Sequence, residues 1–92
     1  MLCMVVEHCK DGNAGPVYQR FREQGRLAPD GLTYVSSWVD EEMQLCFQLM
    51  ETDDRALLDL WISRWEDLVD FDVYPVITSQ EAAVRANQPS TY

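Results

Sequence analysis

The stretch CFQLMETDDRALLDLWISRWEDLVDFDVYP, residues 46–75, decides the fold because its hydrophobic period changes twice. Residues 46–50 alternate with the period of two that is typical of a strand. Apolar side chains then recur at helical spacing, at Leu57, Leu58, Trp61, Trp65 and Leu68. Residues 69–77 return to the shorter period. The stretch therefore predicts a strand, a helix and a second strand, with Asp53 and Asp54 in the first turn of the helix, where carboxylates are favourable.

A weaker copy of this pattern lies upstream. Residues 2–8 are rich in apolar and β-branched side chains and are typical of a strand. From residue 14 to about residue 26 the spacing predicts an amphipathic helix with Asn13 as its N-cap. The turn sequence Pro29-Asp30-Gly31 precedes a strand over residues 32–39. The chain thus begins with its own strand, helix and strand.

The two copies are joined by residues 40–42, between the strand over 32–39 and another over 43–50. So short a connection predicts an antiparallel hairpin. Downstream, Thr78 to Glu81 matches a capping box and predicts a short third helix ending near residue 86. We expect one domain over residues 1–87 and a flexible tail over residues 88–92.

Two strand–helix–strand units with a hairpin between them predict an α+β fold, a ferredoxin-like βαββαβ sandwich with a short C-terminal helix. Right-handed crossovers would place the first and third strands in the centre of the sheet and both long helices on one face. Pro75 cannot donate to a ladder, so we expect the last strand at an edge.

The strand period of two divides the sheet into two sets of side chains. We expect the helix-facing set to be Leu2, Met4, Val6, Leu45, Phe47, Leu49, Phe71, Val73 and Ile77. The opposite set is also too apolar to face water, which predicts a second sheet packed against it. The simplest source is a second copy of the chain, so we predict a homodimer in the form of a dimeric α+β barrel. Its interface residues would be Glu7, Gln48, Met50, Asp72 and Tyr74.

Composition restricts the class of protein. The 92 residues carry a net charge of −9, which argues against nucleic acid and anionic membranes as partners. Cys3, Cys9 and Cys46 form an odd set without CxxC spacing, so we expect neither a disulfide framework nor a metal site. The N-terminus lacks the basic region of a signal peptide, and no apolar run reaches the roughly 20 residues of a membrane span. We expect a soluble cytoplasmic protein without a cofactor.

Four segments also carry a family resemblance. They are EHCKDGNAGPVYQRFREQGR, PDGLTYVSSWVD, CFQLMETDD and WISRWEDLVDFDVYPV. Together they resemble a bacterial family known as domain of unknown function 3303, over about residues 1–80. Members of that family are similar to dimeric α+β barrels, a superfamily that includes cofactor-independent monooxygenases, isomerases, haem-degrading enzymes and proteins without known activity. The resemblance implies a fold and leaves function open. Arg55 departs from the family, which tends to have proline at that helix start.

His8 and Arg26 are the first candidates for chemistry. His8 is the only histidine, and histidine changes charge near neutral pH. It ends the first strand on the parity of Met4 and Val6, so we expect it to point into the gap between sheet and helices, as an acid/base catalyst or as a hydrogen-bonded residue at the core rim. Arg26 suits bidentate binding of an anionic ligand, but it could instead pair with one of the 16 acidic residues.

The remaining candidates are aromatic or acidic. Trp38, Trp61 and Trp65 could roof an aromatic ligand pocket, although the spacing of the last two is more typical of a core. Glu51 could line the mouth of a pocket or cap a turn. Glu7 and Asp72 could form an acid/base pair, or lie in a hydrogen-bonded dimer seam near Gln48. These side chains are the predicted ligand-binding or catalytic set.

Three functions remain open on the sequence. The first is a dimer that binds a small ligand or a protein partner between sheet and helices. The second is a cofactor-independent enzyme on a small aromatic or carbonyl substrate, with His8 as acid/base and Arg26 anchoring an anion. The third is a purely structural dimer. A pocket that reaches His8 would favour the enzyme, and a pocket without converging titratable groups would favour a binding protein.

Overall fold

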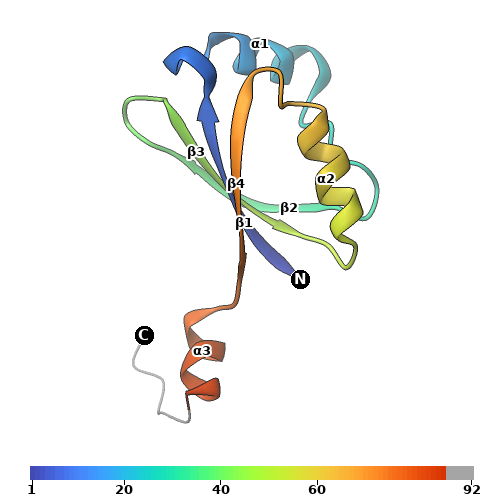
Figure 1. Cartoon of the computed structure of the whole chain (residues 1–92), viewed down its shortest axis with the longest axis vertical. Helices are drawn as coiled ribbons and strands as arrows, with labels where there is room; N and C mark the ends of the chain where they lie inside the picture. The colour runs from blue at the N-terminus through green and yellow to red at the C-terminus, as the bar shows by residue number, and fades with distance from the viewer. Residues whose placement is uncertain (87–92) are drawn as a thin grey trace.

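The structure is a computed structural model that describes residues 1–86. Its elements are β1 (Leu2–Cys9), a 3₁₀ turn η1 (Lys10–Gly12), α1 (Gly15–Gln24), β2 (Thr33–Val39), β3 (Leu45–Glu51), α2 (Arg55–Ser63), β4 (Val69–Val76) and α3 (Ser79–Arg85). The predicted βαββαβ order with a short C-terminal helix is confirmed (Figure 1). The predicted tail, residues 88–92, lies outside the described part of the chain.

The four strands form one antiparallel sheet in the order β2-β3-β1-β4. This order confirms that the first and third strands are central and that the strand containing Pro75 is an edge. The two strands of each strand–helix–strand unit are therefore not neighbours. β3 lies between β1 and β2, and β1 lies between β3 and β4. Both long helices cover the same face of the sheet, which is called the helix face below.

The prediction of which side chains occupy the helix face is wrong for the two central strands. Cys3, Val5 and Glu7 of β1 are the buried ones, and they pair with Met50, Gln48 and Cys46 of β3. For β4 the prediction is right, since Phe71 and Val73 pack against the core. The cause is that both alternating sets of β1 and β3 are apolar, so periodicity separates the sets without saying which one meets the helices.

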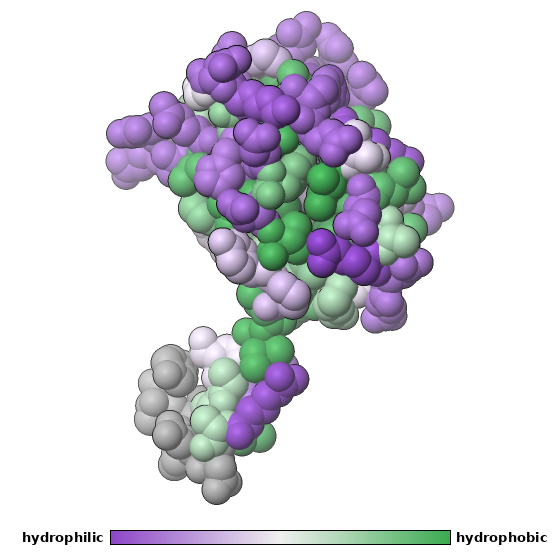
Figure 2. Space-filling view, viewed as in Figure 1, coloured by the Kyte–Doolittle hydropathy of each residue, from purple (hydrophilic) through white to green (hydrophobic). Residues whose placement is uncertain are grey.

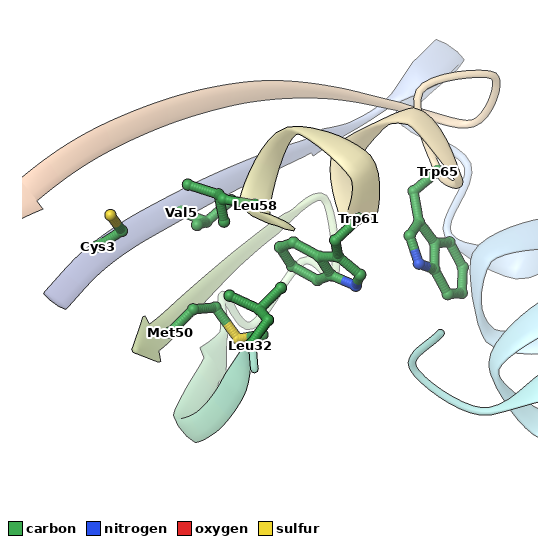
Figure 3. Close-up of a cluster of buried hydrophobic side chains, with 7 residues drawn as sticks. All are labelled: Cys3, Val5, Leu32, Met50, Leu58, Trp61 and Trp65. Carbon is green, nitrogen blue, oxygen red and sulfur yellow. The ribbon is translucent and has the colours of Figure 1, made fainter. Parts of the chain in front are cut away.

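The side chains that face the helices form the core of the molecule. The core consists of Cys3, Val5, Leu32, Met50, Leu58, Trp61 and Trp65 (Figure 3). Trp61 of α2 and Trp65, which follows α2, share this core with the smaller side chains of Cys3 and Val5. Both indole Nε1 groups donate to the main-chain oxygen of Arg26, each at 2.9 Å. That shared acceptor fixes the loop before β2 against α2.

The opposite face of the sheet, called the open face below, carries large apolar side chains. They are Met4, Val6, Trp38, Phe47, Leu49 and Tyr74, with Leu2 and Val76 near one end. The side chains of Trp38 and Tyr74 are 53% and 55% exposed. Apolar surface of this extent on one face of a sheet is unusual in a protein that acts alone.

Local capping positions each helix. Asp54 is the N-cap of α2 and accepts from the main-chain N–H of Ala56 at 2.9 Å. Thr78 caps α3 and accepts from Glu81 N–H at 3.1 Å, as the capping-box sequence predicts. Asn13 lies one residue before the N-cap of α1, yet its side-chain oxygen accepts from Gly15 N–H at 3.0 Å.

α3 stands away from the rest of the molecule at the end of β4 (Figure 1). Figure 2 shows hydrophobic residues around the narrow neck that joins it to the body, whereas the region of α1 is mostly hydrophilic. Val84 on α3 is 71% exposed. α3 thus offers an exposed site for control substitutions that leave the core untouched.

Candidate functional site

A cavity of about 230 Å³ lies between α1 and the helix face of the sheet. Its lining is mainly apolar, and the apolar part includes Ala14, Val17, Tyr18, Phe21, Val39, Met43, Trp61, Trp65 and Val69. The polar part consists of Glu7, Cys9, Arg26, Ser37, Cys46 and Gln48. An apolar hollow with a few convergent polar groups is the usual form of a small-molecule site.

The cavity exists because α1 does not pack tightly onto the sheet. No residue of α1 is buried, and Tyr18 and Phe21 are 39% and 42% exposed. The helix is anchored instead by Arg20, whose two Nη groups bind the two carboxylate oxygens of Asp67 at 2.8 and 2.6 Å. Arg20 Nη1 also donates to the main-chain oxygen of Arg64 at 3.0 Å. α1 therefore covers the apolar cavity, and the contact of Arg20 with Asp67 holds the helix in place.

A chain of polar side chains runs along the floor of the cavity. Arg26 Nε donates to Gln48 Oε1 at 3.0 Å, and Gln48 Nε2 donates to Glu7 Oε2. The Arg26 guanidinium also stacks on Tyr34, with its Cζ 3.7 Å from the ring centroid, and lies 5.2 Å from that of Phe21. Glu7 and Gln48 are only 5% and 7% exposed. The amide of Gln48 thus links a buried carboxyl to a guanidinium.

Burial dominates the electrostatics of this floor. It raises the pKa of Glu7, and hydrogen bonds from Gln48 and Cys46 and the charge of Arg26 offset the rise only in part. Burial, followed by the nearby charge of Glu7, raises the pKa of the Cys46 thiol to about 12. Cys46 therefore stays protonated at neutral pH and is a poor nucleophile. The group whose protonation can change in the cavity is the Glu7 carboxyl.

Glu7→Gln is expected to raise the free energy of unfolding at neutral pH by about 1 kcal/mol, because an amide avoids burying a charge. The folded pKa of Glu7 lies above its ordinary value of 4.5, so the native state binds the proton more tightly than the unfolded chain. Wild-type stability should then fall as pH rises from that value through the raised pKa. Urea unfolding as a function of pH measures this slope, which the variant should lose.

Glu66→Gln is the matched control, because Glu66 is exposed in the turn after α2. It should leave the slope unchanged. A Glu7→Gln variant that is less stable than wild type at neutral pH would show that the ionised carboxylate contributes favourably to the fold.

Comparison with known proteins adds one finding. The family model described as Domain of unknown function (DUF3303) matches residues 1–88. The chain belongs to this family. No curated protein and no solved structure matches it. Membership in DUF3303 confirms the resemblance stated above, and the family's description names no activity, so function has to be argued from the cavity.

Within this DUF3303 chain the structure brings together only part of the predicted ligand-binding set. Arg26, Trp61 and Trp65 all line the cavity. Trp38 and Glu51 do not, since they pair across strands on the open face, Trp38 with Phe47 and Glu51 with Leu2. The indole rings of Trp61 and Trp65 are almost fully buried, so they belong to the core and to the cavity wall at once.

His8 lies on the open face, so the prediction that it points between sheet and helices is wrong. It shares the parity of Met4 and Val6, which also face away from the helices. His8 Nε2 is 2.9 Å from Asp72 Oδ2 on the neighbouring strand. The predicted pairing of Glu7 with Asp72 fails for the same reason, because these two carboxyls lie on opposite faces.

Of the five residues predicted for a dimer interface, Asp72 and Tyr74 lie on the open face. Glu7, Gln48 and Met50 are buried on the helix face instead, and this placement corrects the prediction. The sequence contained one signal for the burial of Glu7. A glutamate is seldom buried without a partner, and Gln48 was expected close to it. Tyr18 and Phe21, within the predicted helix over residues 14–26, were not among the predicted site residues, yet both line the cavity from α1.

Two classes of site find no support in residues 1–86. None of the helices in this range is long and apolar enough to cross a bilayer. Nor does this range bring three or more His, Cys, Asp or Glu side chains together as metal ligands. The cavity with its Arg26–Gln48–Glu7 chain is the strongest candidate site in the described part of the molecule.

Proposed function

We propose that this protein binds a small, mainly apolar ligand in the cavity between α1 and the sheet. The observation that carries the proposal is the combination of an apolar hollow of about 230 Å³ with a buried polar chain on its floor. A buried carboxyl costs stability that hydrogen bonds and a nearby charge offset only in part, so its presence in the floor suggests a purpose other than packing. A ligand that makes polar contacts there would supply that purpose.

The size of the cavity limits the ligand. Pockets for drug-sized molecules usually measure about 300–1,000 Å³. This cavity, at about 230 Å³, suits a ligand with a single ring. His8 lies on the other face of the sheet, so the residue expected to act as acid/base is absent from the cavity lining. That placement removes the predicted acid/base residue from the cavity and argues against the enzyme in the form predicted from the sequence.

A cavity-filling substitution tests the proposal. Benzyl alcohol, benzamide and benzoate serve as single-ring probes in a thermal-shift experiment. A probe at about ten times its Kd stabilises the native state by about 1.4 kcal/mol, which raises the Tm of a chain this small by about 4–8 °C or more. Val17→Phe places a ring in the cavity and should abolish this rise for every probe.

Val84→Phe on α3 is the matched control, since it adds the same ring at an exposed position. It should leave the rise intact. If no single-ring probe shifts the Tm of the wild type, or if Val17→Phe leaves the shift unchanged, the cavity is not the binding site.

We further propose that the open face binds the open face of a second copy of the chain, which would form a dimeric α+β barrel. The apolar side chains Met4, Val6, Phe47 and Leu49 support this, because neither α1 nor α2 covers them. Two such faces are self-complementary under a two-fold axis. The three free cysteines are compatible with the reducing cytoplasm, where we place the protein.

A further inference from the structure

Arg26 makes no direct ion pair within residues 1–86, and its charge acts on the Glu7 carboxyl only from a longer distance. Among residues 1–86, Lys10, Arg20, Arg55 and Arg85 each lie within 4.0 Å of a carboxylate oxygen. Arg26, like Arg22 and Arg64, has no such partner in this range, although the chain holds 16 acidic residues. It is also the only lysine or arginine among the residues that line the cavity. An unpaired cation beside an apolar hollow favours a ligand with a negative charge.

The geometry of Arg26 limits what that charge can bind. A guanidinium has five N–H donors, and within residues 1–86 the Arg26 side chain uses only Nε, on Gln48. Stacking on Tyr34 holds the plane of the group in one orientation. The two Nη groups keep their donors for a ligand, and such a fork matches a carboxylate with two parallel hydrogen bonds.

We propose that the ligand of the cavity is a small aromatic monocarboxylate of the benzoate class, whose carboxylate pairs with Arg26 and whose ring lies among Val17, Phe21 and Trp65. This inference rests on the proposed function, since it names the chemistry of the molecule in the same cavity. The aromatic ring suits an apolar wall that already contains aromatic side chains.

Glu7 links this binding to a proton. The ionisable groups that face it are Cys46 from β3, Arg26 from the loop before β2, Tyr18 from α1 and Cys9 from its own strand. Phe71, its partner on β4, and Gln48 are uncharged. Of these neighbours Arg26 alone is charged at neutral pH, because burial raises the pKa of both thiols and of the tyrosine.

A second carboxylate in this cavity would repel an ionised Glu7, because two like charges in a poorly solvated space raise each other's pKa. Benzoate binding should therefore take up one proton on Glu7. Its affinity should fall as pH rises above the pKa of Glu7 in the free protein, by up to about tenfold per pH unit. A neutral ligand of the same shape would lack this dependence.

Isothermal titration calorimetry with benzoate, benzamide and benzylamine tests the inference, at about pH 6 and about pH 8. We expect wild type to bind benzoate at least about tenfold more tightly than benzamide at the lower pH. Arg26→Gln should remove that preference for benzoate over benzamide. Arg22→Gln, which removes the same charge from an exposed position on α1, should change neither affinity.

A measurement that needs no Arg26 variant guards against the case in which Arg26→Gln fails to fold. Titrations in two buffers with different ionisation enthalpies count the protons taken up on benzoate binding. We expect proton uptake on benzoate binding by the wild type, and none in Glu7→Gln, which should also bind benzoate more tightly at the higher pH.

The outcomes separate this inference from the proposed function. Equal affinities for benzoate and benzamide, or a preference for benzylamine, would overturn the carboxylate and leave a binding cavity in place. Benzoate binding without proton uptake would overturn the link to Glu7. If none of the three probes binds, the cavity itself is not a ligand site and both proposals fail.

Discussion

Trp61→Ala is expected to lower the free energy of unfolding by about 3–5 kcal/mol, the usual cost of truncating a buried tryptophan. The side chain is 1% exposed and packs edge-on against Phe71, with ring centroids 6.0 Å apart. The substitution also removes the indole N–H that binds the main-chain oxygen of Arg26. Small domains have a total stability of about 5–15 kcal/mol, so a large part of it would be lost. Urea unfolding followed by circular dichroism measures the difference.

Leu60→Ala is the control on the same helix, because Leu60 is 43% exposed. It should change the free energy of unfolding by about 0.5 kcal/mol or less. A loss below about 1 kcal/mol for Trp61→Ala would contradict the core role of this residue. The Trp61 side chain would then contribute to the cavity wall rather than to the stability of the core.

Phe47→Asp is expected to convert the proposed dimer into a monomer. Phe47 lies opposite Val6 on one side and Trp38 on the other, at the centre of the open face. A carboxylate there would be buried without a partner in each copy, which should raise the dimer Kd by at least about a hundredfold. Light scattering after size-exclusion chromatography should give twice the chain mass of 10.7 kDa for wild type and one chain mass for the variant.

Leu60→Asp makes the same chemical change on the outward side of α2 and should leave the dimer intact. A wild type that elutes with the mass of one chain at micromolar concentration would overturn the dimer. So would a Phe47→Asp variant that folds normally and remains a dimer, since it would place the interface elsewhere.

The order and type of the elements could be predicted because their signals are local. The change of period within residues 46–75 and the turn at Pro29-Asp30-Gly31 each involve neighbours in the sequence. The βαββαβ order then follows from the rules for connections between strands. Pro75 marked the edge strand through the ladder donor that it lacks.

The orientation of the central strands could not be predicted in this way. Whether Val5 or Val6 meets the helices depends on how the volumes of α2 fit across the sheet, and that fit joins residues far apart in the chain. An error of one residue exchanges the two faces completely. It moved His8 into the predicted cavity and Glu7 out of it.

The sequence therefore identified residues that belong to the site, but it assigned some of them to the wrong face of the sheet. Arg26 was recognised because an arginine fork suits anions, whatever the face of the strands. Gln48 and Glu7 were noted as neighbours, and their closeness is confirmed, but they were assigned to the wrong side of the sheet. Their contact with Arg26 joins a loop to two strands, and no local pattern contains that information.

The contact between Arg20 and Asp67, which holds α1 in place, has a consequence for local motion of the molecule. A helix without buried side chains can detach at a free energy far below that of global unfolding. The Arg20–Asp67 contact is at the surface, so salt weakens it while the tryptophan core stays closed. Amide hydrogens in Gly15–Gln24 should then exchange with solvent through this local opening, and faster as ionic strength increases. The helix that covers the cavity would then also be the segment whose local opening exposes the cavity to solvent.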